Sequence, residues 1–258
     1  MAKIDSYAQG TPSYVELVTP DQRAAKEFYG GLFGWELEDV PLDDTSYYVT
    51  AGKEGDTVAG ISGPMPGMED HPAFWAVYLT VDDVDAAAAA VVDAGGSVDA
   101  GPFDVMDLGR MAAVSDPTGA RVNLWQARSS IGTVRANEPG TPIWNELVTP
   151  DVARATAFYK DVLGVDWEEM PMGDGPAYTC LVVDGRQVAG AMPPQMEGVP
   201  PHWNVYFNVD DVDAAVEHAT ALGASVVAPP FDVPSVGRLA VLSDPQGGMF
   251  NLMAAEQG

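Results

Sequence analysis

The sequence predicts an α+β protein made of two similar halves, each containing two β-α-β-β-β units. The first observation is an internal repeat: residues 10–21 (GTPSYVELVTPD) return at residues 140–151 (GTPIWNELVTPD), with nine of twelve positions identical. The second is the alternation of helix-period segments with short runs rich in β-branched and aromatic residues. The third is the length of 258 residues, which fits two domains of ordinary size.

The repeated segment itself is expected to be a strand. Side chains alternate between the two faces of a strand, so Val15 and Leu17 lie on one face and Tyr14 and Glu16 on the other. A carboxylate on such an apolar strand is either an edge residue in contact with water or part of a site. The role of Glu16 is therefore the main functional question in this sequence.

Two helices are predicted in the first half. Asp21 caps the first helix and Gly34 ends it, while residues 82–83 cap the second and residues 95–96 end it. Strand-like runs separated by turn signals make up the remaining elements of this half. They cover residues 35–37, 46–50, 57–61, 75–81, 97–98, 110–114 and 121–125.

The second half repeats this order. Residues 209–215 copy residues 81–87 at all seven positions, and Asp151 and Gly164 delimit a helix as Asp21 and Gly34 do. Residues between the halves are polar and have no clear periodicity. We therefore expect one domain at residues 1–127, a linker at residues 128–139 and a second domain at residues 140–258.

Composition limits the partners and the compartment. A net charge of −26 argues against nucleic acid and anionic membranes as partners, because both would repel this chain. Cys180 is the only cysteine, so no internal disulfide can form, and its apolar neighbours favour a small core residue. The N-terminus has no signal-peptide pattern and no apolar stretch is long enough to span a bilayer, so we expect a cytoplasmic protein.

The order and spacing of four motifs in each half resemble the vicinal oxygen chelate superfamily, which includes glyoxalase I, bleomycin-resistance proteins, fosfomycin-modifying enzymes and extradiol dioxygenases. The motifs are the Asp21-to-Gly34 helix, the helix start at residues 81–86, Gly109-Arg110 and the Asp-Pro-Thr-Gly turn at residues 116–119. The tandem arrangement is similar to actinobacterial glyoxalase-like proteins labelled hydroxylases or 27 kDa antigens. The resemblance covers nearly the whole chain.

The resemblance implies that each half forms a curved-sheet cup, with helices outside and a ligand inside. Strand alternation then places one set of residues on the inner face of each cup. In the first cup these are Tyr14, Glu16, Ala76, Tyr78, Asn123 and Trp125, and in the second Trp144, Glu146, Asn204, Tyr206, Asn251 and Met253. The aromatic members of both sets suit stacking on a planar ligand.

Metal-dependent members of the superfamily hold their ion at three positions, which the resemblance maps onto residues of each half. They are Tyr14, Ala76 and Asn123 in the first half, and Trp144, Asn204 and Asn251 in the second. Trp and Ala cannot ligate a divalent ion, and Asn is a weak neutral ligand. We therefore expect neither a metal nor another cofactor.

Three residues are the candidates for acid–base catalysis. Glu16 and Glu146 each lie two residues after the mapped ligand position, and burial beside aromatic rings would raise the pKa of such a carboxyl. His202 has the strand parity of the second cup. Arg110 and Arg238 would pair with these carboxylates or with an anionic ligand if they faced the cups, and would be ordinary surface residues if they did not.

These residues leave three functional hypotheses open. The first is a metal-independent protein that binds a hydrophobic, aromatic metabolite, in resistance or in secondary metabolism. The second is an enzyme of glyoxalase, lyase or hydroxylase type that uses Glu16 or Glu146 as acid or base. The third is a structural scaffold with silent cups. We expect the two cups to differ in preference, and the chain to be a monomer with a pseudo-dimer of halves, or a homodimer.

Overall fold

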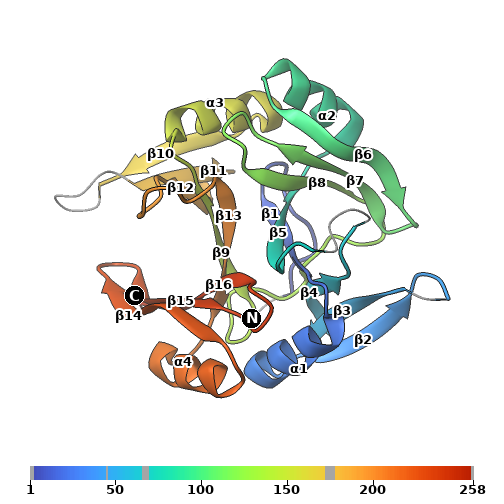
Figure 1. Ribbon diagram of the computed structural model, residues 1–258. Helices are drawn as coiled ribbons and strands as arrows, with labels where there is room; N and C mark the ends of the chain where they lie inside the picture. The colour runs from blue at the N-terminus through green and yellow to red at the C-terminus, as the bar shows by residue number, and fades with distance from the viewer. Residues whose placement is uncertain (1–2, 45, 66–69, 172–177, 257–258) are drawn as a thin grey trace.

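The computed structural model describes residues 3–44, 46–65, 70–171 and 178–256. These residues contain sixteen strands and four helices in four β-α-β-β-β units, and the strands form two eight-stranded sheets. Together with the two repeated halves, this arrangement confirms the predicted α+β class. Figure 1 shows the two sheets side by side, with the helices at the periphery.

The first sheet contains only strands of the first half, in the order β2-β3-β4-β1-β5-β8-β7-β6. Two of its pairs, β1 with β4 and β5 with β8, are parallel, and β1 and β5 pair antiparallel at its centre. Its elements are β1 (Pro12–Val18), α1 (Gln22–Phe33), β2 (Glu36–Pro41), β3 (Tyr47–Lys53), β4 (Asp56–Ser62), β5 (Phe74–Thr80), α2 (Val84–Asp93), β6 (Ser97–Val105), β7 (Gly109–Ser115) and β8 (Arg121–Ala127).

The second sheet repeats this topology with strands of the second half, in the order β10-β11-β12-β9-β13-β16-β15-β14. No unit is therefore exchanged between the halves among the described strands. The elements are β9 (Pro142–Val148), α3 (Val152–Leu163), β10 (Asp166–Met170), β11 (Tyr178–Val183), β12 (Arg186–Met192), β13 (His202–Asn208), α4 (Val212–Ala221), β14 (Ser225–Val233), β15 (Gly237–Ser243) and β16 (Met249–Ala255).

The helices begin where capping residues satisfy their first free N–H groups. The side chain of Asp21 accepts a hydrogen bond from the amide of Ala24, and Asp83, Asp151 and Asp211 cap the other three helices in the same way. Gly34 ends α1 in the left-handed conformation, at φ 68°. The sequence-based helix starts are thus confirmed.

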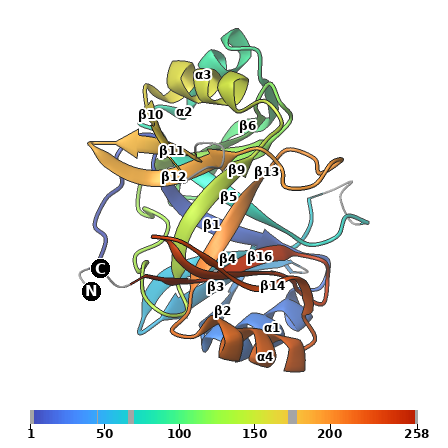
Figure 2. The ribbon, with the colours of Figure 1, turned by 90° about the vertical axis from the view of Figure 1, so that its left-hand side faces the viewer.

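The helices pair across the two halves. Helix α1 lies beside α4, and α2 lies beside α3, so each helix pair takes one member from each half (Figures 1 and 2). Tyr29, Phe33 and Trp35 of the first half pack against Phe207 and Phe250 of the second. The helix-side faces of both sheets thus share one continuous hydrophobic core.

Two matched sets of hydrogen bonds tie the halves together through this core. Trp75 Nε1 donates to Tyr29 Oη, which donates at 2.8 Å to a carboxylate oxygen of Asp244 in the other half. Trp203, Tyr159 and Asp116 repeat the arrangement in the opposite direction. Both carboxylates belong to the Asp-Pro-x-Gly turns, so these turns also act at the junction between the halves.

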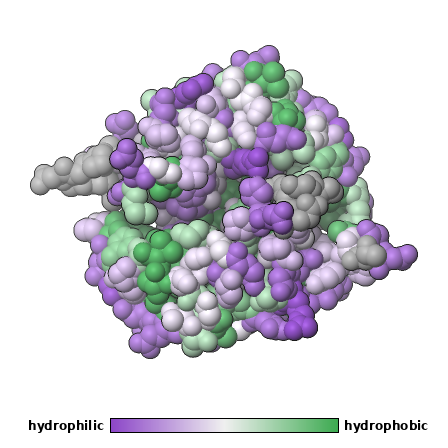
Figure 3. Space-filling model, in the orientation of Figure 1, coloured by the Kyte–Doolittle hydropathy of each residue, from purple (hydrophilic) through white to green (hydrophobic). Residues whose placement is uncertain are grey.

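The described residues contain no helix that is both long and apolar enough to cross a membrane. On the face shown in Figure 3, hydrophilic residues predominate and apolar residues occur in separate small patches. This surface agrees with the net charge of −26.

Candidate functional site

The two faces of the central strands separate as strand alternation predicts. Val15, Leu17, Val77 and Leu79 are buried in the core under the helices. Their neighbours Tyr14, Glu16 and Tyr78 lie on the other face, which is the inner face of the first cup, and contact one another there. The same split occurs in the second half, where Leu147, Val205 and Phe207 join the core.

A half-buried carboxylate, that of Glu16, organises the first cup. One oxygen of Glu16 accepts a hydrogen bond from Ser62 Oγ at 2.6 Å. The other accepts hydrogen bonds from the hydroxyls of Tyr78, at 2.9 Å, and Tyr48, at 3.1 Å. Tyr14 Oη lies 2.8 Å from Tyr48 Oη, and because the Tyr48 proton is directed to Glu16, Tyr14 is the donor of this pair. Three hydroxyl groups therefore donate to one carboxylate, and a fourth, that of Tyr14, donates to one of the three.

The second cup repeats this cluster around Glu146. Tyr178 and Tyr206 donate to its two carboxylate oxygens at 2.7 and 2.9 Å, and Asn204 supplies a further side-chain hydrogen bond. Trp144 Nε1 donates to the Tyr178 hydroxyl at 3.0 Å. The indole N–H of Trp144 thus does for Tyr178 what the Tyr14 hydroxyl does for Tyr48, which explains how the repeat tolerates Tyr at one position and Trp at the other.

Glycine makes room for this arrangement. Strand β4 lies between β3, which carries Tyr48, and β1, which carries Glu16, so Tyr48 must reach across β4. It does so at Gly60, where an added Cβ would lie 1.8 Å from the Tyr48 hydroxyl. Gly190 allows the same approach of Tyr178, again with a Cβ at 1.8 Å. Both glycines are therefore needed for close approach of the tyrosines, and neither has a positive φ.

Burial controls the charge of these groups. Loss of solvation raises the pKa of Glu16 and of Glu146 above the usual glutamate range, although the hydroxyl donors partly oppose this effect by stabilising the carboxylate. Burial also raises the pKa of Tyr14, Tyr78 and Tyr206, so these phenols remain protonated donors at neutral pH. Each cup thus combines a proton-accepting carboxyl with fixed neutral donors.

His202 extends the cluster of the second cup. Its Nδ1 lies 2.8 Å from the carbonyl oxygen of Pro200, and its Nε2 lies 3.1 Å from Asn204 Oδ1. Asn204 in turn hydrogen-bonds Glu146. His202 therefore reaches Glu146 through an amide, without contacting it directly in the described hydrogen bonds. The first cup carries Phe74 and Ala76 at the two corresponding positions.

Three further predicted residues lie beside the clusters. The Asn123 side chain hydrogen-bonds the Tyr78 hydroxyl. Trp125 packs edge-on against Tyr78, with ring centres 6.2 Å apart, and donates Nε1 to the carbonyl of Ser130. Asn251 is buried and donates to the main-chain carbonyl of Val205, so its amide also holds β13 to β16.

Arg110 and Arg238 are not beside the carboxylates of the cups, so of the two alternatives left open by the sequence the structure supports the surface position. Arg110 forms ion pairs with Asp85 and Asp104, and Arg238 forms the same pairs with Asp213 and Asp232. Asp85 and Asp213 lie in the first turns of α2 and α4, so both guanidinium groups are on the helix side of their sheets. The aspartates on the helix side, and not the glutamates of the cups, are therefore the ion-pair partners of both arginines.

Two further residues of the second half lie on opposite faces of the sheet. Trp203 points into the shared core and donates a hydrogen bond to Tyr159. Cys180 is buried as predicted, yet it lies outside the shared core, in register with Gly190 and therefore on the cup side of β11. Burial raises the pKa of its thiol to about 11, so the thiol stays protonated.

Sequence reasoning missed Tyr48, Tyr178 and Ser62 as members of the clusters. The two tyrosines occupy the same position in the two repeats, as Gly60 and Gly190 do. A tyrosine and a glycine that recur together on neighbouring strands are the signal that could have identified them. Ser62 has no such signal, because its counterpart is Met192.

The side chains of the cups do not fit a divalent ion. The mapped ligand positions hold a protonated phenol, an alanine and an amide in one cup, and an indole and two amides in the other. Both oxygens of Glu16 and of Glu146 already accept hydrogen bonds from hydroxyls. In the described parts of the chain, no three His, Cys, Asp or Glu residues are grouped as metal ligands.

Comparison with known proteins agrees with this architecture. The family model of the glyoxalase/bleomycin resistance protein/dioxygenase superfamily matches residues 11–124 and again residues 142–252. A solved structure described as the Mn(II)-bound glyoxalase from Novosphingobium aromaticivorans superposes with a TM-score of 0.65 over 96% of this chain and 83% of that chain. Its sequence identity of 19% shows similarity of the fold alone.

Two curated relatives match over nearly their whole length. The protein named "Putative glyoxylase CFP32" from Mycobacterium tuberculosis is 48% identical over 255 residues, which are 98% of each chain. The anthracycline biosynthesis protein DnrV from Streptomyces peucetius is 36% identical over 265 residues, covering 98% of this chain and 96% of the relative. The chain therefore belongs to the glyoxalase/bleomycin resistance protein/dioxygenase superfamily.

Proposed function

We propose that the chain is a metal-independent small-molecule binding protein whose cups take a hydrophobic, aromatic metabolite that carries a hydroxyl or carbonyl group. The observation that carries this proposal is the repeated cluster of one glutamate and two tyrosine hydroxyls, Glu16 with Tyr48 and Tyr78 and Glu146 with Tyr178 and Tyr206. Two halves that differ at many other positions keep these residues and the glycines that admit them.

The chemistry of the cluster supports a ligand that places a polar group beside the glutamate and an apolar part against the neighbouring rings. The carboxyl with raised pKa accepts from a ligand hydroxyl when ionised, and donates to a ligand carbonyl when protonated. Tyr14 and Trp125 in one cup, and Trp144 in the other, offer ring surfaces, each worth about 0.5–1.5 kcal/mol in a good aromatic pair. The metal-independent part of the proposal is supported by a donor set that does not suit a divalent ion.

The names of the relatives support a planar ligand. DnrV is named for anthracycline biosynthesis, and anthracyclines are fused-ring molecules with phenol and quinone oxygens. Such a molecule combines the flat apolar body and the oxygen groups that these cups would recognise. The same name supports the proposed place in secondary metabolism.

The binding proposal can be tested with 1,8-dihydroxyanthraquinone as a planar probe, titrated while tryptophan fluorescence is recorded. Trp125 and Trp144 border the two clusters, so occupancy should quench their emission. Glu16→Gln and Glu146→Gln should leave the affinity within a few-fold, since glutamine keeps a carbonyl acceptor in place. If no member of a series of fused-ring phenols bound the wild-type protein or the variants, the proposal would be contradicted.

An enzymatic function is the second candidate, and the raised pKa of both glutamates favours it. A carboxyl of this kind could move a proton on a carbonyl-bearing substrate. The relative named as a glyoxylase points in the same direction. Methylglyoxal mixed with 2-mercaptoethanol is a suitable substrate test, followed by NMR in D₂O. Under this function the glutamine variants lose turnover by about 10²–10⁴-fold while probe affinity stays nearly unchanged.

A further inference from the structure

The inner face of the second cup carries four sulfur-containing side chains. Met170 on β10 is in register with Tyr178, and Cys180 Sγ donates to Met170 Sδ at 3.4 Å. Met192 on β12 and Met253 on β16 each lie two residues after a residue already placed on this face, so they share it. Three thioethers and one thiol thus belong to the wall of the cup that contains the Glu146 cluster.

The first cup has no sulfur at the four corresponding positions. They hold an aliphatic residue, two hydroxyl residues and an indole, namely Val40, Thr50, Ser62 and Trp125. The opposite exchange occurs at Met111 of the first cup, whose counterpart is Leu239. The two cups therefore keep the same polar cluster and differ in the stiffness of the wall beside it.

Trp125 is held in place by three sets of contacts. Its Nε1 donates to the carbonyl of Ser130 at 3.0 Å, its ring meets that of Tyr78 edge-on, and the indole lies so close to Gly109 that no Cβ would fit there. A bulky ring with two side-chain torsions, fixed in this way, cannot move aside without losing these contacts. Because Tyr78 donates to Glu16, the indole sets a rigid boundary for a ligand at that carboxylate.

Methionine has the opposite property. Its unbranched side chain has three rotatable bonds and a polarizable sulfur, so it adapts to irregular shapes and makes favourable contacts with aromatic rings. Proteins that bind many partners use methionine-rich surfaces that repack around each of them. Met192 and Met253 are half-buried and Met170 is exposed, so none of the three is fixed in the shared core. The wall of the second cup can therefore adjust to the outline of a ligand.

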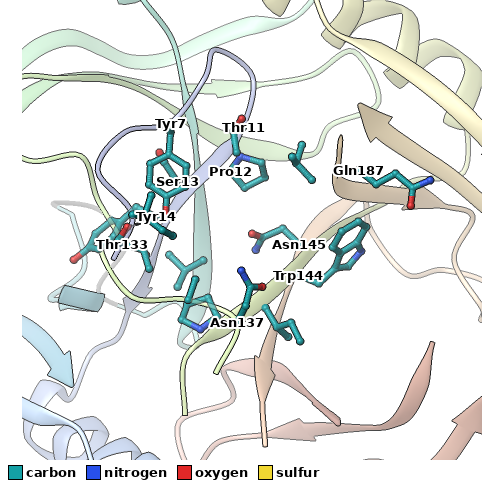
Figure 4. A pocket seen from close by; sticks show the side chains of 16 residues that line it. Tyr7, Thr11, Pro12, Ser13, Tyr14, Thr133, Asn137, Trp144, Asn145 and Gln187 are labelled. Carbon is teal, nitrogen blue, oxygen red and sulfur yellow. Dashed lines mark hydrogen bonds between the residues drawn. The ribbon is translucent and has the colours of Figure 1, made fainter. Parts of the chain in front are cut away.

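The two cups are separate sites. Each sheet consists of strands from one half only. A cavity of about 380 Å³ lies between β1 and β9, with Tyr14 of the first cup and Trp144 of the second on opposite sides of it (Figure 4). A ligand in one cup therefore lies against one sheet, and the selectivity of each cup can be measured by itself.

We propose that the second cup is the adaptable site of the protein, which accepts planar phenols of two to four fused rings, and that Trp125 makes the first cup favour the smaller ones. Met170, Met192 and Met253 determine the breadth of the second cup. This inference rests on the proposed function, because it concerns aromatic ligands that bind beside the two glutamates.

The experiment compares 1-naphthol, 1-hydroxyanthraquinone and 6-hydroxytetracene-5,12-dione, which have two, three and four fused rings. NMR titrations of ¹⁵N-labelled full-length protein follow the backbone amides of Gly60 and Gly190, which lie under the tyrosine hydroxyls of the first and second cup. The dissociation constant of the first cup, divided by that of the second, cancels the affinity that a larger apolar ring gains in both. This ratio should rise by about tenfold or more from the two-ring to the four-ring phenol.

Reciprocal substitutions assign the difference to the wall residues. Met253→Trp copies the first cup and Trp125→Met copies the second, and each should make the ratio nearly independent of ring number. Either variant suffices if the other fails to fold. Met196→Leu is the matched control, since Met196 is 64% exposed and lies outside the strands of the cup, and it should leave the ratio as in wild type.

The outcomes separate this inference from the proposed function. A ratio that stays constant or falls as rings are added would overturn the inference and leave the proposed function intact, because both cups would still bind. A rise that persists unchanged in both reciprocal variants would also overturn it. If none of the three phenols shifted either glycine signal, the proposed function and this inference would fail together.

Discussion

The two cups hold the same carboxylate and the same pair of tyrosine hydroxyls, but they complete the hydrogen bonding in different ways. In the first cup, the third donor is Ser62, on β4. In the second, Met192 replaces that serine, and Asn204 on β13 supplies the donor from the opposite side of the glutamate. His202 then extends the second cluster, where the first cup has Phe74.

This difference separates what the cups share from what distinguishes them. Both cups keep a glutamate, two tyrosines and a glycine. The glycine is kept because one of the tyrosines, Tyr48 or Tyr178, can reach the carboxylate only across it. The third donor and its surroundings vary, and they set the polarity on one side of the carboxylate. We therefore expect both cups to recognise an oxygen group, with the second preferring ligands that offer an additional polar group near His202.

The largest effect is expected from the glycines. In Gly60→Ala or Gly190→Ala, the new Cβ would lie 1.8 Å from a tyrosine hydroxyl, so the tyrosine must leave the glutamate. We expect a loss of about 1–3 kcal/mol in the free energy of unfolding, typical of overpacking, measured by urea denaturation. Binding of 1,8-dihydroxyanthraquinone should be lost in the altered cup and retained in the other. Gly55→Ala is a control for the removal of a glycine, since a Cβ there meets no atom within 4 Å; its positive φ can lower stability but should leave binding intact.

A smaller effect is expected when the third donor of the second cup is removed. Asn204→Ala copies the residue of the first cup and deletes both the donor to Glu146 and the link to His202. It should raise the pKa of Glu146 further and cost about 1 kcal/mol of stability. Adding Met192→Ser places a hydroxyl where Ser62 lies in the first cup, and should restore part of both losses. The pKa of Glu146 is measured by ¹³C NMR of its carboxyl group. An unchanged pKa in Asn204→Ala would contradict the claim that Asn204 is the third donor of the second cup, in the role that Ser62 has in the first.

The third expected effect is a dependence of stability on pH. The folded-state pKa of each glutamate lies above its value of about 4.3 in the unfolded chain, so the folded protein binds more protons in the interval between them. This contribution to stability is full at low pH and is lost as pH rises through the folded-state pKa.

The double variant Glu16→Gln with Glu146→Gln lacks this dependence. The free energy of unfolding of the variant, minus that of wild type, should therefore increase as the pH is raised from 4 to 8. The slope of this difference is at most about 1.4 kcal/mol per pH unit for each glutamate. Urea denaturation curves at each pH give the difference. A constant difference across this range would show that neither glutamate has a raised pKa.

The fold and the inner faces of the cups could be predicted from the sequence because both depend on local pattern. Alternation along β1 places Tyr14 and Glu16 opposite Val15 and Leu17 whatever the strand pairs with, and the repeat supplies the second half. Tyr48 depends instead on β4 lying between β3 and β1, which is a long-range pairing that the alternation does not encode.

Arg110 shows the same limit for charged residues. Its spacing from the Asp-Pro-Thr-Gly turn could be recognised, but the face of β7 that it occupies could not. Asp85 on α2 and Asp104 on β6 determine that face by offering two carboxylates on the helix side. The cavity between the halves was also beyond sequence reasoning, because it forms only when β1 and β9 come together.

The most direct test of the central claim is the affinity for 1,8-dihydroxyanthraquinone before and after exhaustive treatment with a chelator, measured by calorimetry alongside the metal content. If buried glutamates and tyrosines provide the recognition, the dissociation constant should be the same in both samples, and Gly60→Ala with Gly190→Ala should abolish binding. Loss of binding on chelation, with recovery on addition of one divalent ion per cup, would contradict it.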